Sequence, residues 1–207
     1  MIKFNLNNKI LLLIKIIFFY FIFSLKCYSD NLDVKNDLVV LGSDNAIIKI
    51  KIFSSFTCPH CASFHMKIIP EIKKEYIDNN KVQLIFIDFP LDVAALNVSK
   101  LVHCIDKKKQ IDFMDTIYEN QSKWTNGSNI EEINNNIKKI VEDMGISSEQ
   151  FEKCLINEDI EDKILNARIE ANKKYSINAT PTIVINEKKF EDSVNFKNIK
   201  KKIEELI

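Results

Sequence analysis

Two cysteines separated by two residues are the part of this chain best suited to chemistry: Cys58 and Cys61, in the run Cys58-Pro59-His60-Cys61. Such a pair can close a small disulfide, and a cysteine at a helix N-terminus forms a stabilised thiolate because the helix dipole is positive there. The spacing therefore predicts a redox site. Structural bridges and zinc sites use the same spacing. A zinc site would want two further ligands, and only His60 and His65 are nearby in sequence.

The segments around the motif predict a strand that turns into a helix at Cys58. Residues 47–53 alternate isoleucine and lysine before becoming apolar, as a strand does, and a helical pattern runs from residue 59 to about 78. A buried strand is expected at 82–89, and a short first strand at 37–41 is followed by a turn at 42–45. The strand–helix–strand order predicts a parallel pair with a right-handed crossover.

The rest of the chain is mostly helical in pattern. Helices are expected at 93–107, 111–123, 130–144 and from 147 to 175, then a strand at 182–185, a turn at 186–188, a return strand at 189–190 and a closing amphipathic helix at 196–207. The scarcity of glycine and proline, 3 and 4 residues, agrees with a helix-rich structure.

Residues 1–29 are typical of a secretory signal: lysines precede an apolar run at 10–25, and the small residues Cys27 and Ser29 precede an expected cut before Asp30. An uncleaved membrane anchor and a lipoprotein cut at Cys27 are the alternatives. The run is short for a full span, which needs roughly 20 apolar residues.

Cleavage after Ser29 would change both the cysteine count and the charge. It leaves four cysteines in an oxidising compartment, where disulfides persist. It also removes four lysines and no acid, so the formal net charge falls from +0 to −4. No basic tract exceeds a solvated helix face, so we expect no nucleic-acid partner.

Several segments together resemble the DsbA-like thiol:disulfide oxidoreductases of the thioredoxin superfamily. Residues 53–65 resemble the active-site segment, 40–46 its lead-in, 177–182 the cis-proline loop, 184–186 the following strand and turn, and 113–124 and 143–155 pieces of the helical insertion. The resemblance covers the chain from about residue 37 to the C-terminus.

The resemblance implies the fold class, an α/β thioredoxin fold with a helical insertion between the βαβ half and the cis-proline strand. Residues 1–29 are then the signal peptide, 30–90 the N-terminal part of the thioredoxin-fold domain, 91–176 the helical insertion and 177–207 the C-terminal part of that domain.

The four motif residues have different expected roles. Cys58, beside the free backbone donors of the helix start, is the nucleophile that bonds to a client sulfur. Pro59 fits the first helical turn and is assigned to client binding. His60 tunes the site, since its ring can stabilise the Cys58 thiolate and so favour the reduced form. Cys61 is one turn further in and is the expected resolving thiol.

Pro181 is the second expected catalytic element. The resemblance implies a cis bond between Thr180 and Pro181 that faces the two sulfurs, whereas an ordinary trans proline opening a strand is the alternative. A cis bond would expose the Thr180 backbone for strand-like pairing with a client, and Pro181 would keep metals away from the thiolates.

Cys104 and Cys154 fall in the helical insertion. Some members of the family have a structural disulfide there, which the resemblance implies here. Closing a loop of about 50 residues contributes roughly 4 kcal/mol by chain entropy. Two buried free cysteines are the alternative.

The chain departs from the family at one position. The family usually carries a buried acid six residues before the first cysteine, where this chain has Ile52, and the neighbouring Lys51 should face the other side of the strand. Water or another acid, for which Asp88 is a candidate, then handles the proton of the buried thiol, or exchange is slower.

Three functions compete. The first is an exported, monomeric dithiol oxidase of the periplasm, without cofactor or metal, that oxidises reduced or unfolded exported proteins and is reoxidised by a membrane quinone-linked partner. The second is a reductase or isomerase, since Thr180 before Pro181 also resembles the isomerases. Those carry an N-terminal dimerisation domain, however, and few residues separate Ser29 from the first strand. The third is a chaperone-like client-binding module, for which Cys58→Ala would keep binding.

Overall fold

Five strands of the described residues form one mixed sheet in the order β1-β3-β2-β4-β5. The structure, a computed structural model, describes residues 38–207, so the expected signal segment 1–29 lies outside the described residues. The strands are β1 (Val39–Leu41), β2 (Ile48–Ser54), β3 (Val82–Asp88), β4 (Thr182–Ile185) and β5 (Lys188–Lys189). The predicted parallel pair, β2 and β3, is confirmed, and the other neighbours are antiparallel.

The helical stretch predicted from residue 59 to about 78 is confirmed, although it is not one continuous helix. It is divided into α2 (Pro59–Lys67), α3 (Ile69–Ile72) and a π-helical turn, η1 (Lys73–Ile77). Pro70 has no N–H to donate to the preceding turn, so the regular bonding pattern cannot continue through it.

The helices of the insertion follow β3. They are α4 (Val93–Cys104), the short 3-10 turn η2 (Lys107–Lys109), α5 (Gln110–Glu119), α6 (Gln121–Trp124), α7 (Ile130–Asp143), α8 (Ser148–Leu155) and α9 (Glu158–Tyr175). The helical pattern at 147–175 is thus interrupted. The side chain of Asn157 accepts a hydrogen bond from Ile160 N at 3.0 Å and starts a new helix there.

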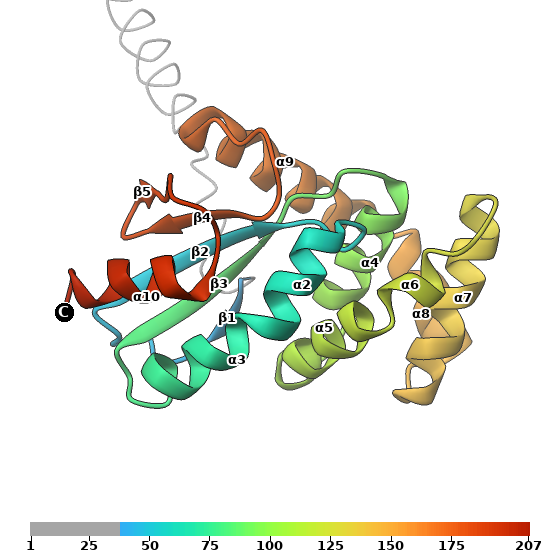
Figure 1. Cartoon of the computed structure of the whole chain (residues 1–207). Coiled ribbons are helices and arrows are strands. Elements are labelled where there is room, and N and C mark those ends of the chain that lie inside the picture. The colour runs from blue at the N-terminus through green and yellow to red at the C-terminus, as the bar shows by residue number, and fades with distance from the viewer. Residues whose placement is uncertain (1–37) are drawn as a thin grey trace, which may run out of the picture. The chain divides into compact units, whose positions relative to one another are not determined.

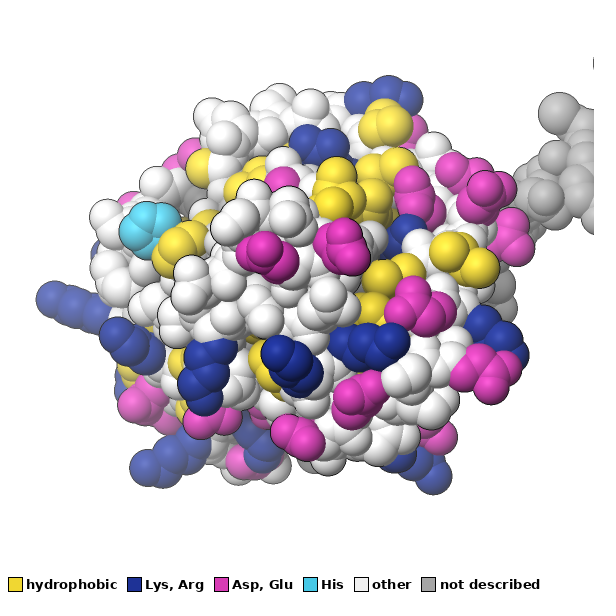
Figure 2. All heavy atoms as spheres, turned by 90° about the vertical axis from the view of Figure 1, so that its right-hand side faces the viewer, with side chains coloured by type: hydrophobic (Ala, Val, Ile, Leu, Met, Phe, Trp, Pro, Cys, Tyr) yellow, Lys and Arg dark blue, Asp and Glu magenta, His cyan; other side chains and the backbone are white. Residues whose placement is uncertain are grey.

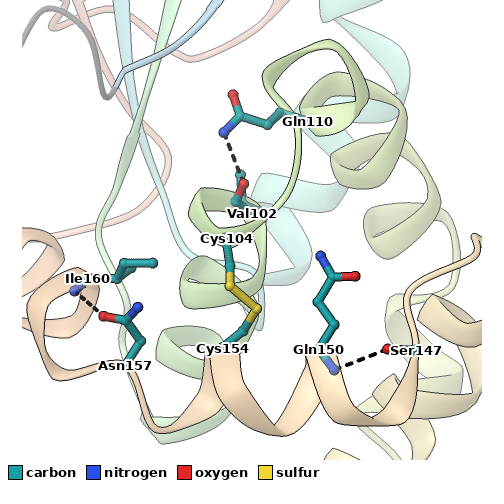
Figure 3. The surroundings of a disulfide bond; sticks show 8 residues. All are labelled: Val102, Cys104, Gln110, Ser147, Gln150, Cys154, Asn157 and Ile160. Atoms are coloured by element: carbon teal, nitrogen blue, oxygen red, sulfur yellow. Dashed lines mark hydrogen bonds between the residues drawn. A yellow bond between two sulfur atoms is a disulfide. The ribbon is translucent and has the colours of Figure 1, made fainter.

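A disulfide joins the C-terminal end of α4 to α8, between Cys104 and Cys154 (Figure 3). The two residues are 50 positions apart in sequence. The bond therefore closes a loop that contains four of the insertion's elements, η2, α5, α6 and α7.

The turn between β4 and β5 contains only Asn186 and Glu187, both with positive φ, so β5 begins at Lys188 rather than at the expected residue 189. Glu187 accepts hydrogen bonds from Lys174, Lys51 and Tyr175. These contacts tie the end of α9 to the sheet, and α10 (Phe196–Glu204) closes the fold.

The two faces of the sheet carry separate apolar clusters. Ile50 and Ile52 belong to a large cluster that includes side chains of α2, the insertion and α10. Phe53 belongs to a smaller cluster with Val184 and with Ala171 of α9. Alternation along β2 thus places one face against α9 and the other against α2, which crosses in front of the sheet in Figure 1.

Charged side chains of both signs are interspersed on the face that bears α7 and α8 (Figure 2). Hydrophobic side chains lie between them, mainly in the upper half of that view. Such mixing is typical of a solvated surface. No helix within residues 38–207 combines the length and apolar character needed to span a bilayer.

Candidate active site

The two motif cysteines lie at the start of α2, just after β2 ends. Cys58 is the N-cap residue, with Pro59 at the first helical position. The backbone oxygen of Cys58 accepts hydrogen bonds from Cys61 N and Ala62 N at 3.0 and 3.1 Å. The side chain of Cys58 is 8% exposed and that of Cys61 1%, and both are free thiols. The outer thiol is therefore the one that a second protein can reach.

Pairing of β2 with β4 brings the Thr180–Pro181 segment to these sulfurs. Phe53 is the register partner of Thr182, and the bond between Thr180 and Pro181 is cis. The thiol of Cys58 donates a hydrogen bond to the backbone oxygen of Thr180 at 3.3 Å. Residues 122 positions apart thus form one site.

The hydroxyl of Thr180 is placed to stabilise a thiolate. Its Oγ1 atom is buried and, among the described residues, has no hydrogen-bond partner in the dithiol form. It lies beside both sulfurs and lowers the pKa of both thiols, because it can donate its hydrogen to a negative sulfur. Sequence reasoning assigned only the backbone of Thr180 to the site, so the hydroxyl is an additional feature.

The environment gives the two thiols different pKa values. Burial raises the pKa of Cys58, but hydrogen bonds from the Thr180 side chain, the Cys61 thiol and backbone N–H groups of the first turn outweigh it, so the pKa lies below its usual value. Burial raises the pKa of Cys61 to about 12. The site accordingly has one thiol that ionises readily and one that holds its proton.

The other motif residues are exposed. The side chains of Pro59 and His60 lie on the open side of the first turn. The backbone of the motif is held in place by Gln121 of α6. Its Nε2 donates to Phe56 O at 2.7 Å and to Cys58 O at 3.1 Å. No sequence pattern indicates Gln121, because it meets the motif only through the packing of the insertion.

Ile52 is buried, and Asp88 provides a carboxylate on the same face of the sheet. Asp88 is the register partner of Ser54, two residues after Ile52. Its oxygens are hydrogen-bonded to Ser99 and His103, both at 2.6 Å. Lys51 points the other way, toward Glu187, as expected.

A small cavity connects this carboxylate with Tyr118. Ser54, Asp88 and Tyr118 line it together with apolar side chains, and its volume of about 10 Å³ is at the lower limit for holding one water molecule. Burial raises the pKa of Tyr118 well above its usual value, and the charges of Cys61 and Asp88 raise it further. The hydroxyl of Tyr118 is thus neutral, and both the buried thiol and the acid are close enough to affect its pKa.

The remaining histidines pack within the fold. The His65 ring packs at a tilt against Tyr118, with centroids 4.6 Å apart, and is hydrogen-bonded to Asp115 at 2.6 Å. Within residues 38–207, no group of three or more histidine, cysteine or acidic side chains is arranged to hold a metal ion.

Comparison with known proteins gives consistent results. Residues 34–205 match the protein family described as Thioredoxin. A Bacillus cereus protein named as a disulfide bond formation protein D is 33% identical over 153 residues, which are 70% of this chain and 68% of that protein. A Rickettsia bellii protein named as a protein-disulfide oxidoreductase is 31% identical over 157 residues, which are 73% of this chain and 58% of that protein.

The fold comparison points to the same branch of the superfamily. The crystal structure of Wolbachia pipientis alpha-DsbA1 has a TM-score of 0.73 and 28% identity, and the match covers 82% of this chain and 90% of that one. The crystal structure of oxidised BdbD from Bacillus subtilis has a TM-score of 0.71 at 23% identity, which shows the shared fold, and covers 83% of this chain and 93% of that one. The chain therefore belongs to the DsbA-like thiol:disulfide oxidoreductases of the thioredoxin superfamily.

Proposed function

We propose that this protein is an exported dithiol oxidase, which donates the Cys58–Cys61 disulfide to reduced proteins in the periplasm. The observation that carries the proposal is the difference in pKa between the two thiols beside Thr180. A thiolate that is stabilised at Cys58 favours the reduced form of the pair, and a pair whose reduced form is stable is a strong oxidant.

The reaction balances in two exchange steps. A client thiolate attacks the sulfur of Cys58, the Cys58–Cys61 bond breaks, and Cys61 leaves as a thiolate that takes up a proton. A second client thiolate attacks the client sulfur of the mixed disulfide and releases Cys58 as a thiolate. The client loses two electrons and the pair gains them, and a membrane quinone-linked partner reoxidises the pair.

Asp88 handles the proton of Cys61 in this proposal, in place of an acid at position 52. The route runs through the Tyr118 hydroxyl and the water-sized cavity between Tyr118 and Asp88. The carboxylate is held in place by hydrogen bonds with Ser99 and His103.

Export is supported by the disulfide between Cys104 and Cys154, since such bonds persist in oxidising compartments. The signal-like segment 1–29 supports it from the sequence. Determining the N-terminus and the compartment of the protein in the cell tests this part, and a cytosolic protein with an intact segment would contradict it.

The activity is tested with the domain covering residues 30–207 and a reduced, unfolded client. The wild type should form client disulfides, and Cys58→Ala should form none while still binding the client. The equilibrium potential in glutathione buffers then fixes the direction: a strongly oxidising value agrees with the oxidase, whereas a value near that of thioredoxin, about −270 mV, would make the protein a reductase.

A further inference from the structure

The only arginine of the chain lines a groove beside the proposed active site. Every other one of the 29 Lys and Arg residues is a lysine. Arg168 belongs to α9 and borders a groove of about 430 Å³. Apolar side chains of Phe89, Leu91, Ile169 and Ile177 share the lining.

Both walls of this groove touch the segments that hold the cysteines. On one wall, Phe89 N donates to Ser54 O at 2.7 Å and Leu91 N donates to Ser55 Oγ at 3.3 Å. On the other wall lies Ala179, directly before the residue whose carbonyl oxygen accepts the Cys58 thiol hydrogen. The groove therefore adjoins the segments on both sides of the cysteines.

The Arg168 side chain packs on an aromatic ring but forms no ion pair within residues 38–207. Its guanidinium carbon lies 5.1 Å from the centre of the Phe89 ring. The Nε atom is buried without a hydrogen-bond partner, and no carboxylate of residues 38–207 forms an ion pair with this side chain. The other cation of the groove, Lys173, is paired with Glu170 at 2.9 Å. A buried donor without a partner costs free energy, which an incoming acceptor recovers.

We propose that Arg168 binds the carboxylate of an aspartate or glutamate close in sequence to the client's reacting cysteine, and so selects clients with an acidic residue there. The inference rests on the proposed function, because it concerns the client of the same site. A planar guanidinium that rests on an aromatic ring offers paired N–H groups in the geometry of a carboxylate, which a lysine cannot do. The apolar side chains of the groove lower the local dielectric constant and so strengthen that contact.

The test uses reduced peptides with two cysteines that differ only in carrying glutamate or glutamine. The residue is moved one position at a time along either side of the first cysteine, and kcat/KM for peptide oxidation is measured. At the best position the wild type should prefer glutamate roughly tenfold, as expected for one hydrogen bond between charged groups. The preference should shrink as salt is added.

Matched variants separate client recognition from simple packing of Arg168 on Phe89. Arg168→Gln should abolish the glutamate preference, and Arg168→Lys should retain only part of it, because the charge stays but the paired donors are lost. Lys173→Gln removes one charge from the same groove and should keep the preference. The effect of glutamate on the peptide's own thiol is the same for every enzyme variant, so it cancels in these comparisons.

The outcomes are distinct. Equal oxidation of both peptides at every position by the wild type, or a preference that survives in Arg168→Gln, overturns the inference. The wild-type ratio and its salt dependence need no variant, so a misfolded Arg168→Gln protein does not leave the question open. If the wild type oxidises neither peptide, the proposed function fails instead.

Discussion

Replacing Thr180 with valine should make the Cys58 thiolate harder to form while leaving the fold intact. The two side chains have nearly the same shape, and only the hydroxyl beside the sulfurs is lost. Because Thr180 Oγ1 is buried without a partner in the dithiol form, its removal leaves no other group unsatisfied. The backbone oxygen that accepts the Cys58 thiol hydrogen is unchanged.

The size of the effect follows from the hydrogen bond that is lost. A hydrogen bond to a charged group contributes about 1.5–3 kcal/mol, and Thr180 is only partly buried, which favours the lower limit. The equilibrium between thiol and thiolate at Cys58 should therefore shift roughly tenfold toward the thiol. The reduced form loses the same stabilisation, so the potential should become less oxidising by about 30 mV.

The assay is the absorbance of the thiolate as a function of pH, measured on the reduced protein, together with the redox equilibrium in glutathione buffers. The rate of attack by Cys58 should fall less than the thiolate population, by about threefold, because a more basic thiolate is also a better nucleophile. Thermal unfolding should show the valine variant to be at least as stable as the wild type.

Thr182→Val, two residues further along at the start of β4, is the matched control. The hydroxyl of Thr182 donates to Ala179 O at 2.7 Å, so its removal should lower stability without changing the titration of Cys58. The reasoning is refuted if Thr180→Val titrates like the wild type, or if both variants shift the titration equally.

Three further changes test other parts of the structure. Replacing Cys104 and Cys154 with alanine opens a loop of 50 residues and should lower the free energy of unfolding in urea by about 4 kcal/mol; an unchanged value would contradict the chain-entropy argument. Hydrogen bonds from two lysines and a tyrosine lower the pKa of Glu187 from 4.5 to about 2, so it stabilises the fold above pH 4.5, by at most about 1 kcal/mol given its exposure, and the stability difference from Glu187→Gln should disappear as the pH falls to about 2. Asp88→Asn should slow the release of the second of the two coloured thiolates from dithiobis(nitrobenzoate), on the order of a hundredfold, while the first release, by Cys58, and both releases in the helix-capping control Asp106→Asn stay as in the wild type.

The parts of the site that the sequence could predict are those formed by residues close together along the chain. Cys58 and Cys61 share one helical turn, and Thr180 and Pro181 precede a strand that the sequence pattern predicts. Local pattern did not predict the break around Pro70, because apolar residues continue at helical spacing through it.

The remainder of the site depends on contacts between distant segments. Gln121 contacts the motif although 63 residues separate it from Cys58. The Thr180 hydroxyl lacks a hydrogen-bond partner among the described residues only because of how the surrounding chain packs. The groove at Arg168 forms only because the loop after β3 and the end of α9 lie together. Such features have no period or motif, so a single sequence does not reveal them.

Because 122 residues separate Cys58 from Thr180, the two halves of the site are made at different times during synthesis of the chain. A chain is synthesised from its N-terminus, so the dithiol helix exists well before the strand that covers it. Cys104 and Cys154 also emerge before Thr180 does. All four cysteines are therefore present before the disulfide-exchanging site is complete, so wrong pairings among them can form in the unfinished chain.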